Sequence, residues 1–166
     1  AIADGKLDFM AMGRKQLADP NYADSLARGG REAVRPCIYC YTCFSQAMLS
    51  QPLRCSVNGD LGFESKNLMA PAAQPKHVVV IGGGPEASNQ LGGTARIAAI
   101  AYAPNGDFVD WLKRQLETLK VDVRLKTTAT ADSVRALKPD AVIVATGAIR
   151  RAPDIPGKDL PHVHDG

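Results

Sequence analysis

The stretch HVVVIGGGP, at residues 77–85, decides the fold of this chain. Its first half is a continuous run of β-branched residues, which is typical of a strand buried on both faces of a parallel sheet. Its second half is a glycine turn of the kind that lets the backbone approach a pyrophosphate, with a following helix N-terminus to receive the charge. The stretch predicts the first strand and turn of a dinucleotide-binding fold, with an ordinary glycine-rich turn as the alternative.

The residues after this turn depart from the dinucleotide-binding pattern. Gly82, Gly84 and Ala87 satisfy G-x-G-x-x-A, which is a weak signal by itself. The full fingerprint also needs a helix, a second strand and then an acidic residue about 20 positions on that holds the ribose. Here Glu86 follows Pro85 directly, so the sequence shows only half of a nucleotide site. The residues of this region that we expect to bind the cofactor are Gly82, Gly84, Pro85, Glu86, Gly92 and Gly93.

The rest of region 77–166 alternates between helix and strand. Apolar residues on one face predict a helix over 107–120, and a strand is expected over 121–125. A short helix over 131–137 and a strand over 141–144 follow. This order of strand, helix and strand indicates a mostly parallel sheet in an α/β fold.

The first 35 residues show a different sequence pattern. Residues 7–12 form a short apolar run followed by Gly13 and Arg14, which looks like a strand ending in a loop suited to a phosphate. A helix broken at Pro20 is expected over 14–28.

Four cysteines, the only ones in the chain, fall in the spacing Cys37-x2-Cys40-x2-Cys43-x11-Cys55. A compact triplet with a remote fourth thiolate is a common way to hold an iron–sulfur cluster. Zinc sites more often use two separated Cys-x2-Cys pairs. The spacing therefore predicts a [4Fe–4S] cluster in segment 36–76, with structural zinc as one alternative and disulfides or free thiols as another.

Cationic and aromatic residues accompany the cysteines. Arg35 and Arg54 would offset the negative charge of a four-thiolate cluster, although solvated surface arginines explain the pattern equally well. Tyr39, Tyr41 and Phe44 lie among the cysteines and are expected to shield a cluster from water.

Composition excludes several classes of function. The net charge is +3, with scattered basic residues and no run of five or six like charges, which argues against a nucleic-acid partner. No apolar stretch approaches the length of a membrane span. We expect a cytoplasmic protein, because the rest of the chain reads as an intracellular α/β protein, in which disulfides are rare. No Ser/His/Asp arrangement or carboxylate pair suggests hydrolysis, and whether the chain forms a homo-oligomer stays open.

Together, these motifs resemble the C-terminal part of the trimethylamine dehydrogenase, 2,4-dienoyl-CoA reductase and 2-enoate reductase group. These are old-yellow-enzyme-type NADH:flavin oxidoreductases. The resemblance is carried by DGKLDFMAMGR at 4–14, RPCIYC at 35–40, LRCSVN at 53–58, VVIGGGP at 79–85 and VATGA at 144–148.

The resemblance implies a fold in three parts. Residues 1–35 would be the last strand–helix unit of a TIM barrel, in which Gly13 and Arg14 meet the phosphate of FMN. Residues 36–76 would be an irregular iron–sulfur segment. Residues 77–166 would be an incomplete Rossmann-like FAD/NAD(P)-binding domain. In this domain the stretch VATGA at 144–148 resembles the end of a strand in such flavoproteins. It would supply three further cofactor contacts, Ala145, Thr146 and Gly147.

The resemblance also implies a function for the intact enzyme. The resemblance is to domains that hold FAD or ADP, and hydride would pass between NAD(P)H and FAD where FAD is the occupant. Single electrons would cross the [4Fe–4S] cluster to or from FMN, which reduces an enoate or enoyl substrate or oxidises an amine. The front of the barrel is absent, so the catalytic residues are unknown and no turnover is expected from this chain alone. A segment also looks to be missing between Pro85 and Glu86; with it, Glu86 would regain a place on the ribose.

Two rival hypotheses remain from the residues themselves. A non-enzymatic electron carrier would have a reducible cluster and no affinity for flavin or nucleotide. A zinc-stapled interaction domain would be colourless and hold about one zinc ion.

Overall fold

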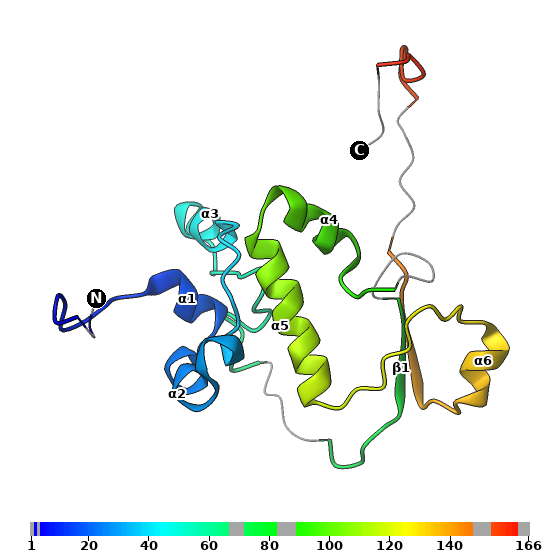
Figure 1. Ribbon diagram of the computed structural model, residues 1–166, viewed down its shortest axis with the longest axis horizontal. Coiled ribbons are helices and arrows are strands. Elements are labelled where there is room, and N and C mark those ends of the chain that lie inside the picture. The colour runs from blue at the N-terminus through cyan, green and yellow to red at the C-terminus, as the bar shows by residue number, and fades with distance from the viewer. Residues whose placement is uncertain (1, 3, 67–71, 83–88, 148–153, 163–166) are drawn as a thin grey trace.

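The structure is a computed structural model that describes residues 2, 4–66, 72–82, 89–147 and 154–162 (Figure 1). Helices precede, separate and flank a pair of strands. In chain order the elements are α1 Gly13–Ala18, α2 Tyr22–Ala33, α3 Thr42–Met48, β1 Val78–Gly82, α4 Gly93–Ala101, α5 Pro104–Thr118, α6 Ala131–Ala136 and β2 Ala141–Ala145.

The two strands form a parallel pair. The register runs from Val78 opposite Ala141 to Gly82 opposite Ala145. The connection between them carries three helices, and α4 and α5 lie on one side of the pair while α6 lies on the other (Figure 1). The parallel α/β arrangement predicted from the sequence is therefore confirmed for this part of the chain.

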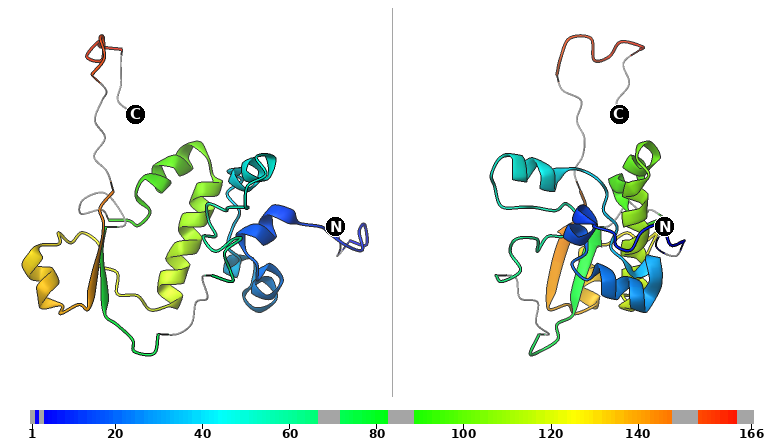
Figure 2. Two further views of the ribbon diagram at one scale, coloured as in Figure 1. Left: turned by 180° about the vertical axis from the view of Figure 1, so that it is seen from behind. Right: turned by 90° about the vertical axis from the view of Figure 1, so that its left-hand side faces the viewer.

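The N-terminal helices α1 and α2 lie on the side of α5 that faces away from the strands, as Figure 1 and the left view of Figure 2 show. The apolar core is small: among the described residues, its buried hydrophobic members are Ala18, Val57 and Val109. Both strands leave apolar side chains open to solvent, with Val144 70% exposed. The sheet thus presents faces that a larger fold would cover.

Two predicted strands do not form. Residues 7–12 and 121–125 are irregular in the structure, so both predictions were wrong. A strand exists only when a neighbour accepts and donates its backbone hydrogen bonds. Among the described residues, the strands are β1 and β2, which pair with each other. Apolar sequence alone could not supply the missing partners.

The helices follow the sequence more closely. The predicted break at Pro20 separates α1 from α2, and α6 lies where a short helix was expected. The helix predicted over 107–120 begins earlier, at Pro104, because proline suits the first turn of a helix. Helix α4 was not predicted, although its alanines favour a helix. No helix among the described residues is long and apolar enough to cross a membrane.

Candidate functional site

The four cysteines are gathered around α3. Cys37 and Cys40 precede this helix, Cys43 lies in its first turn and Cys55 follows in the next loop. All four are free thiols, so the disulfide alternative is not found.

Hydroxyl groups connect the cysteine triplet to the loop of the fourth cysteine. The Cys40 Sγ lies 3.2 Å from Ser56 Oγ and 3.3 Å from Thr42 Oγ1, and the two hydroxyls are 3.0 Å apart. Burial by itself raises the pKa of the Cys40 thiol, but hydrogen bonds with Ser56 and Thr42 outweigh it and leave the pKa below its ordinary value. This favours the thiolate, which is the form that binds metals.

The backbone of the triplet turns tightly. Tyr39 and Tyr41 have positive φ angles of 53° and 59°, and the Tyr39 N–H donates to Cys37 Sγ at 3.4 Å. Residues other than glycine rarely adopt this conformation. The turns keep Cys37, Cys40 and Cys43 in one short, folded stretch.

The donor set suits a thiolate-bound metal centre, but the thiols do not converge. Segment 36–76 offers four cysteines and no histidine. Four sulfur ligands fit an iron–sulfur cluster or a zinc ion held by thiolates alone. Within the part of the chain that the structure describes, however, no three His, Cys, Asp or Glu side chains are arranged to hold a metal ion. The cluster therefore stays a prediction.

Arg14 faces the tyrosines of the cysteine segment. Its guanidinium lies 4.6 Å from the ring centre of Tyr41 and 5.2 Å from that of Tyr39. A hydrogen bond with Tyr41 is the main influence that raises the pKa of Arg14. Its Nη1 is buried without a hydrogen-bond partner. The neighbouring Gly13 opens α1. An unpaired cationic donor here fits the phosphate contact expected of this pair.

The predicted nucleotide residues fall into two groups. Gly84, Pro85 and Glu86 lie outside the described residues, so the glycine turn itself is not placed. The remaining members meet around β1 and β2, where Gly82 pairs with Ala145. Five of them line a cavity of about 550 Å³: Gly92, Gly93, Ala145, Thr146 and Gly147.

Helices α4 and α5 supply the other walls of this cavity. Their lining residues are mainly apolar and include Ile97, Phe108, Leu112 and Leu116, with Lys113 as a cation.

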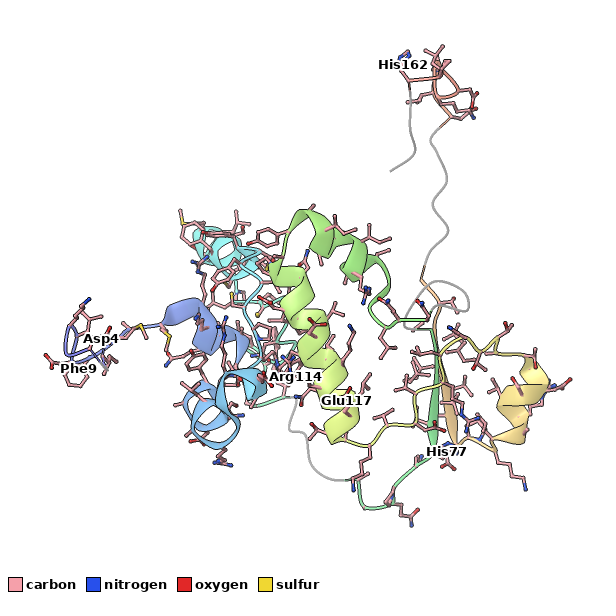
Figure 3. The ribbon with its side chains drawn as sticks, viewed as in Figure 1. Asp4, Phe9, His77, Arg114, Glu117 and His162 are labelled. Carbon is pink, nitrogen blue, oxygen red and sulfur yellow. The ribbon has the colours of Figure 1, made fainter. Side chains whose placement is uncertain are left out.

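Figure 3 labels Arg114 and Glu117 on α5, between the N-terminal helices and the strand pair, and His77 at the start of β1. The His77 N–H donates to Asp140 Oδ2 at 2.7 Å, which ties the beginnings of the strands together.

Two buried polar residues, Asp19 and Asn58, were not predicted from the sequence. Asp19 is 7% exposed and accepts the backbone N–H groups of Asn21 and Arg35. Asn58 is 4% exposed, and its Nδ2 donates to the Leu17 carbonyl at 2.9 Å. Trp111 of α5 is partly buried and donates from Nε1 to the Ala33 carbonyl. Apart from the local bond of Asp19 to Asn21, these contacts join distant segments, and nothing in the local sequence signals them.

No family model matches the chain. Curated relatives do. The chain is 33% identical over 186 residues to a bilirubin reductase of Mediterraneibacter gnavus, covering 99% of this chain and 29% of that protein. It is 35% identical over 184 residues to an NADH oxidase of Thermoanaerobacter brockii, covering 95% of this chain and 28% of that protein. The chain thus spans less than a third of the length of these relatives.

A solved structure shares the fold. The 6-hydroxypseudooxynicotine amine oxidase of Pseudomonas geniculata N1 superposes with a TM-score of 0.82 at 30% identity. The match covers 97% of this chain and 29% of that chain. The arrangement of helices and strands described above therefore recurs within a larger redox enzyme.

Proposed function

Because the chain belongs to the trimethylamine dehydrogenase, 2,4-dienoyl-CoA reductase and 2-enoate reductase group of NADH:flavin oxidoreductases, we propose that it forms the electron-transfer part of such an enzyme. The names of its relatives are those of reductases and oxidases. Reduction of an enoate or enoyl substrate, or oxidation of an amine, is the activity proposed for the whole enzyme.

One observation carries the proposal: four free thiols occupy one short segment, and hydroxyl contacts tie the triplet to the loop of the fourth. Cys37, Cys40, Cys43 and Cys55 would hold the [4Fe–4S] cluster, which supplies one-electron transfer when bound. Ser56 and Thr42 would donate to the sulfur of Cys40. Hydrogen bonds of this kind tune the potential of a cluster.

The flavin and nucleotide contacts are proposed on separate grounds. The buried, unpaired Nη1 of Arg14 supports a contact with the phosphate of FMN. The cavity beside Gly92 and Gly147 supports binding of the adenine part of FAD, or of ADP, against apolar walls. NAD(P)H would supply the hydride in the intact enzyme. Each contact concerns only part of a site, since most of the barrel lies outside this chain.

The nucleotide site also lacks a segment. The alignment with the bilirubin reductase runs over 186 residues, at least 20 more than the 166 residues of this chain. We place the gap between Pro85 and Glu86, where the expected helix and second strand are missing. Binding of FAD would then be weak, and this incomplete site is the one observation that favours a non-enzymatic electron carrier.

Anaerobic reconstitution with iron and sulfide tests the proposal. About four iron and four sulfide per chain, with a broad absorbance at about 400 nm, are expected. A colourless protein that keeps about one zinc ion would replace electron transfer with a structural role. A chain that takes up neither metal contradicts the proposed site. Titration of the reconstituted protein with ADP then separates the enzyme part, which binds it, from the carrier, which does not.

A further inference from the structure

Arg35 is hydrogen-bonded to two other parts of the chain, at residues 18–19 and at Val57. It lies two positions before Cys37. Its backbone N–H donates to Asp19 Oδ2 at 2.9 Å. Its Nη1 donates to two backbone carbonyls, that of Ala18 at 3.5 Å and that of Val57 at 3.3 Å. Because Ala18 is 0% and Val57 9% exposed, these bonds are largely shielded from water.

The contact with Val57 links the two ends of the cysteine site. Val57 follows Cys55 by two positions, just as Arg35 precedes Cys37 by two. A single guanidinium therefore joins the chain that enters the first cysteine to the chain that leaves the fourth. The separation along the sequence is 22 residues, so no local turn provides the same restraint.

Helix α5 supports this guanidinium from the other side. The Arg35 group lies 5.1 Å from the ring centre of Trp111, within cation–π range. Trp111 is itself held, since its Nε1 donates to the Ala33 carbonyl at 3.2 Å and its ring stacks on Phe108. The ring thus limits how the guanidinium can turn.

We propose that Arg35 is a positioning residue that holds the first and fourth cysteines of the site in register, with Trp111 orienting its guanidinium. The proposal rests on the proposed function in that the four cysteines act as one thiolate site. The role is geometric. The planar guanidinium of an arginine can donate to a carbonyl and lie against an aromatic ring at the same time, whereas the ammonium of a lysine is a point charge. Lysine should therefore fail to replace Arg35, although it keeps the charge.

Cobalt binding to the reduced, metal-free chain tests this role, because Co²⁺ reports thiolate ligation through its charge-transfer and visible bands. We expect Arg35→Lys to weaken Co²⁺ binding by about tenfold or more, the usual effect of losing a residue that supports a metal ligand. Arg35→Met should do the same. Arg28→Lys, on the exposed face of α2, should stay within about twofold of the wild type.

Three outcomes overturn the proposal. The first is an Arg35→Lys variant with wild-type affinity beside an impaired Arg35→Met, which would show that only charge matters. The second is an equal loss in Arg28→Lys. The third is an unchanged effect of Arg35→Lys in a Cys55→Ser background, because a residue that acts through Cys55 should lose its effect when that ligand is gone.

A second variant guards against misfolding of the Arg35 variants. Trp111→Leu removes the aromatic ring that contacts Arg35, and this substitution lies on α5, outside the cysteine segment. Circular dichroism checks that the helices of the variant persist. It should weaken Co²⁺ binding, and Trp111→Phe should restore part of the loss. Wild-type affinity in a folded Trp111→Leu protein removes Trp111 from the proposal.

The iron analysis tests the proposed function and the cobalt titration tests the role of Arg35, so the two can be contradicted independently. A wild-type chain that binds Co²⁺ but assembles no iron–sulfur cluster contradicts the proposed function, and the ratio of wild-type to Arg35→Lys affinity still decides the role of Arg35. A wild-type chain that binds no Co²⁺ has no joined thiolate site, and the positioning role falls with it.

Discussion

Gly82 lies so close to Ala145 that a Cβ atom at Gly82 would overlap the Ala145 carbonyl. The two residues are the last of β1 and β2 and face each other in the parallel register. Gly82 also has a φ of 131°, a conformation that side chains rarely adopt. Glycine is thus required at the point where the predicted phosphate turn leaves the sheet.

Replacing Gly82 should loosen the end of the strand pair. Gly82→Ala must either shift β2 or change the backbone, and we expect a loss of about 2 kcal/mol in the free energy of unfolding, measured by urea denaturation. Gly59→Ala is the matched control, since nothing lies within 4 Å of an added Cβ there. Equal stability of the two variants would contradict the close packing of Gly82.

The buried amide of Asn58 should stabilise the fold without any metal. Asn58→Asp keeps the oxygen that accepts the Asp60 N–H but loses the donor to the Leu17 carbonyl, and it buries a charge. A loss of about 1–3 kcal/mol is expected in urea denaturation of the metal-free chain.

Asn21→Asp provides the comparison for Asn58. Its side chain is exposed at the start of α2 and makes no capping hydrogen bond, so an added charge there should cost little. If both variants unfold at the same urea concentration as the wild type, the contact with Leu17 contributes nothing to stability.

The features that could be predicted from the sequence depend on local patterns, and those that could not depend on contacts between residues far apart in the chain. The β-branched run before Gly82 and the strand ending at Ala145 carry their own signal, and the chain order fixed their parallel pairing. Residues 121–125 carry a similar signal but lack a partner strand. The cysteine spacing predicted one gathered segment; the bonds of Arg35 to Val57 and of Asn58 to Leu17 depend on tertiary packing across 22 and 41 residues.

The hydroxyl of Ser56 should tune the reconstituted cluster. When Cys40 is a thiolate, the hydroxyl 3.2 Å away donates to it and stabilises the more negative, reduced state. Ser56→Ala should therefore lower the midpoint potential by on the order of tens of mV, measured by an anaerobic titration followed by electron paramagnetic resonance. Ser45→Ala, at an exposed position of α3, should leave the potential unchanged. A Ser56→Ala potential equal to the wild type would show that the hydroxyl does not donate to the cluster.

The nucleotide cavity should gain affinity when the missing segment is restored. Its walls are the apolar faces of α4 and α5, and the strands beside it leave Val80 59% and Val144 70% exposed. Burying apolar surface is favourable by about 25 cal/mol per Å². A helix and strand inserted after Pro85 should therefore be stabilised by packing on these exposed apolar side chains. They would also bring a helix N-terminus toward the phosphates.

A chimaera tests this directly. The corresponding residues of the bilirubin reductase, about 20 in number by the alignment, are inserted between Pro85 and Glu86. We expect ADP to bind at least about tenfold more tightly than to the unmodified chain, measured by isothermal titration calorimetry. A glycine–serine insert of the same length is the control, because it restores the spacing but not the apolar helix. Equal ADP affinity of the two insertions would mean that the cavity is not the adenine site and that Glu86 does not act on a ribose.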